Sequence, residues 1–139
     1  MEVRSHCPIN FTLEHFGDKW SLLIIRDLMF KGKRHYNEFL EADEKVSTSV
    51  LGDRLKKLEE AGIISRGEDS VKKSRIRYSL TRKGIDLLPI LIEMILWGGF
   101  IDDLTEAPKE FLDQATQNRK ALIHEIRKDL LKEHISTQV

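Results

Sequence analysis

The stretch Val46–Gly62, VSTSVLGDRLKKLEEAG, constrains the fold more than any other part of the sequence. Leu51, Leu55 and Leu58 recur at helical spacing as a single narrow stripe, which predicts a helix buried along one face only. Ser47 suits the capping position before the first turn, and Gly62 is a typical helix end. The start of the helix and its sides away from the stripe carry small or charged residues, namely Ser47, Thr48, Ser49, Gly52, Asp53, Arg54 and Lys56.

Taken alone, such a segment is more often an ordinary solvated helix, but its neighbours favour a specific fold. Helices are expected at 8–17, 19–30 and 35–42, then the helix at 47–61, strands at 63–66 and 75–80, and helices at 82–98 and 108–134. Pro89 should bend the helix at 82–98, which follows the hairpin, and Gly98–Gly99 should end it. This order predicts a mainly α protein with a small β-hairpin: a winged helix-turn-helix with flanking helices.

The length of 139 residues suits a modest core. We expect residues 1–107 to hold the winged helix-turn-helix with its flanking helices, and residues 108–139 to form a C-terminal helical extension. The apolar stretch 85–101 is interrupted by Asp86, Pro89 and Glu93, and we expect it to be too short and too polar to span a membrane. With one cysteine and no visible signal peptide, the composition suits a protein of the reducing cytoplasm.

Charge is unevenly distributed along a chain whose net charge is zero. Residues 31–83 contain 14 Lys or Arg against 9 Asp or Glu, whereas residues 84–139 contain 6 against 10. A basic middle region between acidic ends predicts one surface that contacts a polyanion.

Double-stranded DNA is the polyanion that this arrangement favours. A major groove admits one α-helix, and a helix start rich in small hydroxyl side chains can approach bases and phosphates without collision. Arg54 and Lys56 can contact the backbone or base edges. In the hairpin, a wing over residues 66–77 presents basic side chains to a phosphate strand or a minor groove, namely Lys72, Lys73, Arg75 and Arg77.

Other kinds of site find little support. The five histidines show no metal-ligand spacing with one another or with Cys7, so no metal and no cofactor are expected. Ser21 lacks a histidine-base pattern, and the chain has no glycine loop of the type that binds phosphate, so an enzyme is not expected.

The sequence resembles the HxlR-type winged-helix transcriptional regulators. The matching stretches are CPI at 7–9, GDKWSLLIIRDL at 17–28, YNEF at 36–39, VSTSVLGDRLKKLEEAGII at 46–64, YSLTRKG at 78–84, and LLPIL followed by Trp97. The resemblance implies a homodimer on a pseudo-palindromic operator, with dimer contacts from the N-terminal segment and the helices after the wing. It places Ser47, Ser49, Gly52, Asp53 and Arg54 on the recognition helix, and Arg75 and Arg77 on the wing.

Several positions depart from the family pattern. Position 49 is commonly basic and is serine here, position 52 is commonly threonine and is glycine, and position 35 is often arginine and is histidine. The wing usually has prolines before its arginine, where this chain has KKSR. An operator sequence therefore does not transfer from relatives to this chain.

Three alternatives stay open on sequence grounds. In some family members the cysteine beside proline senses oxidants, quinones or aldehydes, so Cys7 is either an effector-responsive sensor or a small buried residue at a dimer interface. Asp53 either accepts a hydrogen bond from cytosine N4 or tethers Lys56 or Lys57. The whole domain either binds DNA or is a winged-helix protein–protein module without DNA binding.

Overall fold

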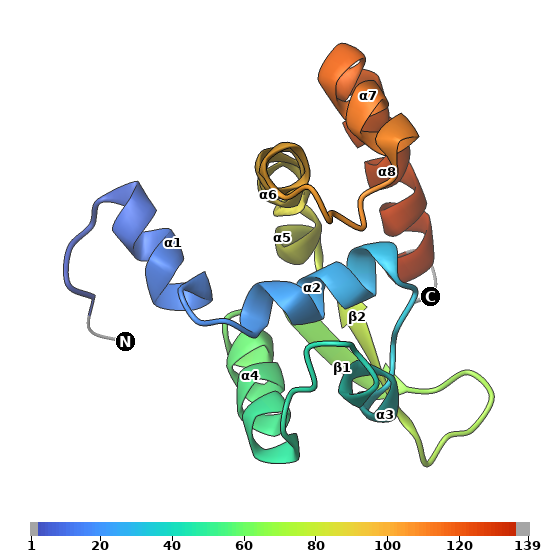
Figure 1. Ribbon diagram of the computed structural model, residues 1–139. Helices are drawn as coiled ribbons and strands as arrows, with labels where there is room; N and C mark the ends of the chain where they lie inside the picture. The colour runs from blue at the N-terminus through green and yellow to red at the C-terminus, as the bar shows by residue number, and fades with distance from the viewer. Residues whose placement is uncertain (1–2, 136–139) are drawn as a thin grey trace. The chain divides into compact units, whose positions relative to one another are not determined.

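A computed structural model describes residues 3–135, which divide into two compact units, one ending at Thr81 and the other beginning at Arg82 (Figure 1). The first unit contains four helices followed by a hairpin. Their bounds are α1 Pro8–Phe16, α2 Ser21–Phe30, α3 Tyr36–Leu40, α4 Thr48–Glu60, β1 Ile64–Glu68 and β2 Ile76–Leu80. The predicted mainly α fold with a β-hairpin is confirmed, with α3 and α4 as the helix-turn-helix and the hairpin as the wing.

The core of the first unit forms where α2, α4 and the sheet meet. Leu51, Leu55 and Leu58 are all buried, as the predicted stripe requires. Ile25 and Leu28 of α2 are buried too, and α4 contacts both α2 and β1. Each large aliphatic side chain that is buried in this way stabilises the fold by roughly 1.5–3 kcal/mol. The core therefore holds α4 by one face and leaves its opposite face to solvent.

The helix ends of the first unit follow from local chemistry. Asp18 Oδ2 accepts the backbone N–H groups of Trp20 and Ser21, each at 2.9 Å, so α2 begins two residues later than predicted. Gly32 and Gly62 take positive φ angles of 65° and 74° just after α2 and α4, where a residue with a side chain would be strained.

The sheet pairs Ile64 with Leu80 and Arg66 with Tyr78 in antiparallel register. Tyr78 and Leu80 are buried, but Ile76 is exposed because it lies at the wing end of β2. Ser79, on the opposite face of β2, is also buried, and Arg34 Nη2 donates to its hydroxyl at 2.6 Å.

The second unit differs from the prediction at two helix breaks. Its helices are α5 Arg82–Ile85, α6 Leu88–Ile101, α7 Lys109–Gln117 and α8 Arg119–His134. Pro89 separates α5 from α6 and lies in the first turn of α6, where its missing N–H has no helical partner to lose. The single helix predicted from 108 to 134 is broken at Asn118, whose φ of −132° and ψ of 49° are not helical.

The predicted end of α6 at Gly98–Gly99 was wrong, because the helix continues to Ile101. Gly99 lies against α7: a Cβ atom at this position would come within 2.8 Å of a Leu112 methyl carbon. The glycine therefore allows a close helix contact instead of ending the helix. Leu112, Ala115, Leu122 and Leu130 are buried within this unit, so α7 and α8 direct their apolar stripes inward.

The segment Arg82–Ile101 is, by length and composition alone, sufficient to cross a membrane, and the expectation that it is too short and too polar was wrong. Core helices pass the same test. Leu88, Leu91 and Ile92 are buried here, whereas Ile90, Met94, Trp97, Phe100 and Ile101 are exposed along α6.

Candidate nucleic-acid interface

The first turn of α4 exposes a run of small hydroxyl side chains. Ser47, Thr48 and Ser49 are all exposed, and the Ser47 hydroxyl accepts the backbone N–H of Val50 at 3.3 Å, as predicted for a capping residue. The Tyr36 hydroxyl donates to the Thr48 carbonyl oxygen at 2.9 Å, which ties this turn to α3. The positive end of the helix dipole and three hydroxyl groups therefore face solvent together.

The outer face of α4 continues with Gly52, Asp53 and Lys56, all exposed. No atom lies within 4 Å of the place where a Cβ of residue 52 would be, so this part of the helix surface is open. Asp53 Oδ2 lies 3.3 Å from Lys57 Nζ and also accepts a hydrogen bond from Arg54. Of the two roles expected for Asp53, the structure therefore shows the intramolecular tether, with Lys57 as its lysine partner.

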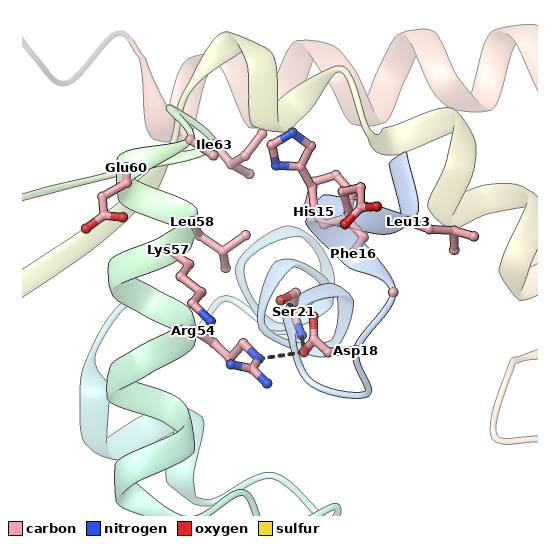
Figure 2. Close-up of a pocket in the computed structure, with 13 residues that line it drawn as sticks. Leu13, His15, Phe16, Asp18, Ser21, Arg54, Lys57, Leu58, Glu60 and Ile63 are labelled. Carbon is pink, nitrogen blue, oxygen red and sulfur yellow. Dashed lines mark hydrogen bonds and ion pairs between the residues drawn. The ribbon is translucent and has the colours of Figure 1, made fainter. Parts of the chain in front are cut away.

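Arg54 projects from the flank of α4 toward the start of α2 (Figure 2). Its Nε donates to Asp18 Oδ2 at 2.8 Å. Partial burial alone would raise the pKa of Asp18, but the Ser21 hydroxyl, the Trp20 N–H and Arg54 outweigh it and lower this pKa to about 2. The same contact raises the pKa of Arg54. The partly exposed Arg54 side chain is thus engaged with a carboxylate of the same chain, on the flank of α4.

A groove of about 590 Å³ lies between α1 and α4, beside this ion pair. Leu13, Phe16, Leu58 and Ile63 form its apolar lining, and Figure 2 shows His15 on the α1 side. Sequence reasoning missed this groove because its walls come from segments about forty residues apart, and neither segment carries a motif for it.

The turn of the wing spans residues 69–75, between the ends of β1 and β2. Lys72, Lys73 and Arg75 are exposed there, whereas Arg77 lies within β2, opposite Gly67, and is half-buried. Asp69 shapes the turn, because its Oδ2 accepts the backbone N–H groups of Val71 at 3.1 Å and Lys72 at 2.9 Å. Three of the four basic residues predicted for the wing are therefore presented directly to solvent.

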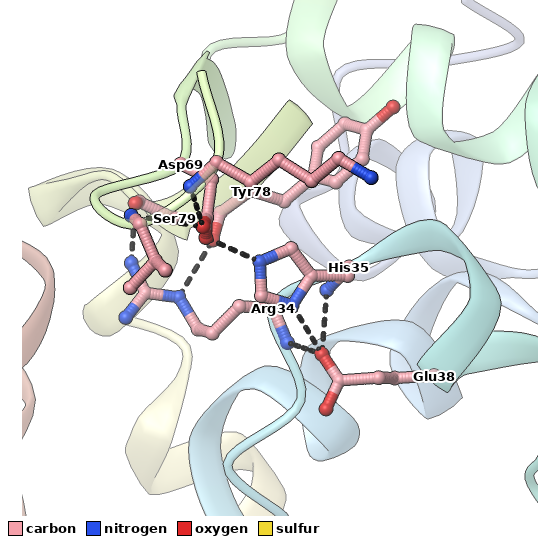
Figure 3. Close-up of polar contacts among 8 residues, drawn as sticks. Arg34, His35, Glu38, Asp69, Tyr78 and Ser79 are labelled. Atoms are coloured by element: carbon pink, nitrogen blue, oxygen red, sulfur yellow. Dashed lines mark hydrogen bonds and ion pairs between the residues drawn. The ribbon is translucent and has the colours of Figure 1, made fainter. Parts of the chain in front are cut away.

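A polar cluster joins the wing to the start of α3 (Figure 3). His35 contacts Glu38 Oε1 through Nδ1 at 2.6 Å and Asp69 Oδ1 through Nε2 at 2.7 Å. Beside it, Arg34 Nε donates to the Tyr78 carbonyl oxygen at 2.7 Å. Sequence reasoning noted His35 only as a departure from the family pattern, because Asp69 is 34 positions away and no local motif links the two.

Both carboxylates of this cluster are held in the charged form. The pKa of Asp69 lies well below its usual range because of the Lys72 backbone N–H and then the His35 ring. Partial burial would raise the pKa of Glu38, but the Arg34 backbone N–H and the His35 ring lower it overall. The carboxylates contact opposite nitrogens of the ring, and the described residues contain no group of three His, Cys, Asp or Glu side chains that could hold a metal ion.

Cys7 lies immediately before α1, with its side chain exposed. The pKa of its thiol is lowered by the backbone N–H of Asn10 and then by that of Ile9, at the start of the helix. Nearby, the Arg4 side chain bonds Glu14 at 2.8 Å and Asn10 at 2.8 Å. Cys7 therefore has the exposure and the lowered pKa that a reactive thiol needs.

The start of α4 and the wing are brought together through α3. Tyr36 contacts the first turn of α4, and the preceding residue, His35, contacts the wing. Nine of the eleven residues predicted to contact DNA are exposed, at the start of α4, on its outer face or in the wing turn: Ser47, Thr48, Ser49, Gly52, Asp53, Lys56, Lys72, Lys73 and Arg75. Arg54 and Arg77 lie away from these exposed positions.

Comparisons with known sequences agree with this architecture. Residues 15–105 match the model of the HxlR-like helix-turn-helix family. A helix-turn-helix-type transcriptional regulator of Synechocystis is 41% identical over 88 residues, which are 63% of this chain and 64% of that protein. YdeP of Bacillus subtilis, of the same type, is 32% identical over 83% of this chain and 84% of its own length.

Solved structures of similar proteins share the fold. The structure of PA1607 superposes with a TM-score of 0.66 at 30% identity, over 76% of this chain and 72% of its own. The redox regulator HypR in its oxidised form gives 0.62 at 33% identity, over 70% of this chain and all of HypR. Quinone-bound YodB of Bacillus subtilis gives 0.55 at 26% identity, over 70% of this chain and all of YodB.

The family consists of DNA-binding transcriptional regulators and not of enzymes, in agreement with the sequence-based expectation. The matched region includes the helix-turn-helix, the wing and α6. By sequence, fold and the arrangement of α3, α4 and the wing, this chain belongs to the HxlR-like helix-turn-helix family of transcriptional regulators.

Proposed function

We propose that this protein regulates transcription by placing the start of α4 in a DNA major groove while the wing contacts the phosphate backbone or the adjacent minor groove. The observation that carries this proposal is the link through α3, which joins an exposed hydroxyl-rich helix start to a basic wing turn. Ser47, Thr48, Ser49, Gly52 and Lys56 face the groove in this arrangement.

The small side chains at the start of α4 allow a DNA duplex to come close to the helix. Serine and threonine hydroxyls can donate to or accept from either phosphates or base edges, and Gly52 leaves the duplex room to approach the helix backbone. Asp53 and Arg54, which are bonded to Lys57 and Asp18 in this structure, join the interface only by exchanging these partners for DNA.

We further propose that the regulator acts as a homodimer on a pseudo-palindromic operator. Ile9, Phe11 and Leu13 are exposed on α1, and Ile90, Met94 and Trp97 are exposed on α6. Apolar surface of this extent commonly marks a protein or membrane interface. We assign the α6 face to the second protomer and not to a membrane, because α6 lies within the region that matches a family of DNA-binding regulators, and we place the protein in the cytoplasm.

Cys7 is proposed as the point where an oxidant or electrophile acts on the regulator. Its exposure and the lowered thiol pKa support this role, as do the similar proteins HypR, solved in an oxidised form, and YodB, solved with a quinone. Modification beside the apolar face of α1 would act on dimer geometry, without a direct contact between Cys7 and DNA.

Selection of bound duplexes from random DNA tests the proposed function. We expect enrichment of one pseudo-palindromic sequence with half-sites separated by about one helical turn, roughly 34–36 Å. Affinity for the selected duplex should fall steeply with salt and exceed affinity for a scrambled duplex by at least about 10³-fold. Equal binding to selected and scrambled duplexes would overturn sequence-specific regulation by this surface.

A further inference from the structure

Arg66 lies on β1, outside the turn of the wing, and shares one face of the hairpin with Tyr78. The two residues are paired across the sheet, and the side chains of a cross-strand pair point to the same side. Tyr78 is buried, whereas half of the Arg66 side chain is exposed to solvent. This face of the hairpin therefore leads from the core to a positively charged side chain at the surface.

The same face of the hairpin and one side of α4 border an open cleft of about 660 Å³, the α4–hairpin cleft. Gly52, Lys56 and Glu59 line it from α4, and Arg66 and Tyr78 line it from the hairpin. The three α4 residues are spaced by four and then three positions, so they form one stripe along the helix. No described atom lies within 4 Å of the place for a Cβ of Gly52, so the cleft is open toward the start of α4.

The geometry of B-form DNA determines what must lie between a helix in the major groove and a wing in the adjacent minor groove. The two DNA grooves are about 12 Å and about 6 Å wide, and a phosphate strand separates them. A protein that enters both from one side must leave room for that strand, and lysine or arginine beside it displaces the counterions of the phosphates. The α4–hairpin cleft offers such room, with Lys56 on one side and Arg66 on the other.

We propose that the α4–hairpin cleft receives the phosphate strand between the major groove bound by α4 and the minor groove beside the wing, and that Lys56 and Arg66 contact phosphates of this strand from opposite sides. The inference rests on the proposed function and extends it. It adds Arg66 to the cations of the wing turn, and it assigns Lys56 to the DNA backbone instead of to a base edge.

Two glutamates determine which part of the cleft suits a phosphate. Glu59 and Glu60 line the cleft from the last turn of α4, whereas Gly52 and Lys56 lie earlier in the helix. Repulsion from the two carboxylates therefore favours a phosphate beside Gly52 and Lys56. Glu59 Oε2 lies 3.9 Å from Arg66 Nε, and because both side chains are well exposed, this ion pair contributes little and can be exchanged for a phosphate contact.

Three substitutions separate a contact by Arg66 from the loss of one positive charge. Arg66→Ala removes the charge from the cleft, and Arg66→Lys keeps it on a flexible side chain. Arg82→Ala is the matched control, because this exposed arginine at the start of α5 does not line the cleft. All three proteins should melt within about 3 °C of the wild type, since the changes are at the surface.

Titrations of the selected duplex and of a scrambled duplex measure the contact. Arg66→Ala should weaken binding to both by about fivefold to tenfold at roughly 0.1 M salt, because a phosphate contact carries no sequence information. Its logarithmic salt slope should be flatter by roughly 0.9. Arg66→Lys should keep the wild-type slope, and Arg82→Ala should follow the wild type. Wild-type affinity and slope in Arg66→Ala would overturn the inference.

Uncharged phosphate analogues locate the contact on the DNA. Each phosphate of the selected duplex is replaced in turn by a methylphosphonate, and the loss of wild-type affinity is measured at each position. We expect losses of about fivefold to tenfold at contacted phosphates. The loss at one or two adjacent phosphates in each half-site should vanish in Arg66→Ala, and Lys56→Ala should abolish the loss at neighbouring phosphates of the same strand.

The positions of these phosphates test the assignment to the cleft. They should lie between the bases of the half-site and the phosphates whose losses vanish when Lys72, Lys73 and Arg75 are replaced. Equal reduction of the losses at all positions in Arg66→Ala, or Arg66 and Lys56 contacts on different strands, would overturn the inference while sequence-specific binding stands. If the wild type does not prefer the selected duplex, the proposed function fails and this inference fails with it.

Discussion

Arg54 Nε donates to Asp18 Oδ2 at 2.8 Å and thereby connects α4 to the residue that caps α2. Asp18 also accepts from the Ser21 hydroxyl at 2.7 Å, so a single carboxylate organises the start of α2 and orients the flank of the proposed recognition helix. The groove between α1 and α4 opens beside this pair.

Asp18→Asn should lower the free energy of unfolding at pH 7 by about 1–2 kcal/mol, because it weakens a cap and removes the charge opposite Arg54. The pKa of Asp18 is about 2 in the folded protein, against 3.8 ordinarily, so its contribution is present above pH 3.8 and is lost as pH falls toward 2. Urea unfolding at several pH values should therefore show the two proteins converging in acid. Asp113→Asn on the surface of α7 is the control, and a constant gap down to pH 2 would contradict the assignment.

Gly52→Ala and Gly62→Ala should change stability in opposite directions. Position 52 is helical and open, so alanine should raise the free energy of unfolding by about 0.5–1 kcal/mol. Position 62 has φ of 74°, so alanine should lower it by roughly 1–2 kcal/mol. Thermal unfolding of the two variants and the wild type measures both effects on the same helix. If both substitutions raised or both lowered the free energy of unfolding, the result would be inconsistent with the backbone geometry.

Replacing Lys72, Lys73 and Arg75 together with alanine should weaken binding to all duplexes alike. The logarithmic salt slope should flatten by roughly 0.9 for each phosphate contact that is lost. Alanine at Lys109, Lys120 and Lys128, exposed in the second unit, removes the same charge elsewhere and should change the slope less. An unchanged slope in the wing variant would show that these residues do not contact the backbone.

Trp97→Glu should dissociate the proposed homodimer without unfolding the protomer, because this side chain is 71% exposed. Light scattering at micromolar concentration should show a dimer for the wild type and a monomer for the variant, with the dissociation constant raised roughly 100-fold. Val71→Glu, at an exposed wing position, should remain dimeric. A monomeric wild type would remove the basis for the two-fold operator.

Cys7→Ser should abolish the release of DNA by a mild oxidant or a quinone, while leaving affinity in untreated protein within about twofold. Coupling requires that modified and unmodified protein differ in DNA affinity, since the reagent and the operator must each favour one state. Operator titrations of both proteins, with and without reagent, measure this. Equal release from both would assign the response to another group.

The parts of the fold that follow from local spacing were predictable. Leu51, Leu55 and Leu58 alone indicated the buried face of α4, and Ser47 and Gly62 marked its ends, because caps and periodicity are encoded within a few residues. Pro89 indicated an interruption near the start of α6. The break at Asn118 was missed, since asparagine is tolerated inside helices and only the observed backbone angles place it outside one.

The contacts that refine the site were not predictable in the same way. Arg54 bonds a residue 36 positions away and His35 bonds one 34 positions away, so each contact depends on packing that no local pattern reports. Arg54 consequently stood among the residues expected to contact DNA, although the structure engages it with Asp18. Whether it exchanges partners on DNA remains a prediction that the operator complex of Asp18→Asn would test.

The close approach of Gly99 to Leu112 limits which pairs of residues positions 99 and 112 can carry in related sequences. A Cβ gained at position 99 would come within 2.8 Å of a Leu112 methyl carbon, so the Leu112 side chain must rotate away or be replaced by a smaller one. Among descendants that keep the contact between α6 and α7, we therefore expect these two positions to change together, so that a larger residue at 99 accompanies alanine or another small residue at 112. Lineages that lose α7 escape this constraint, and position 99 is then free to vary by itself.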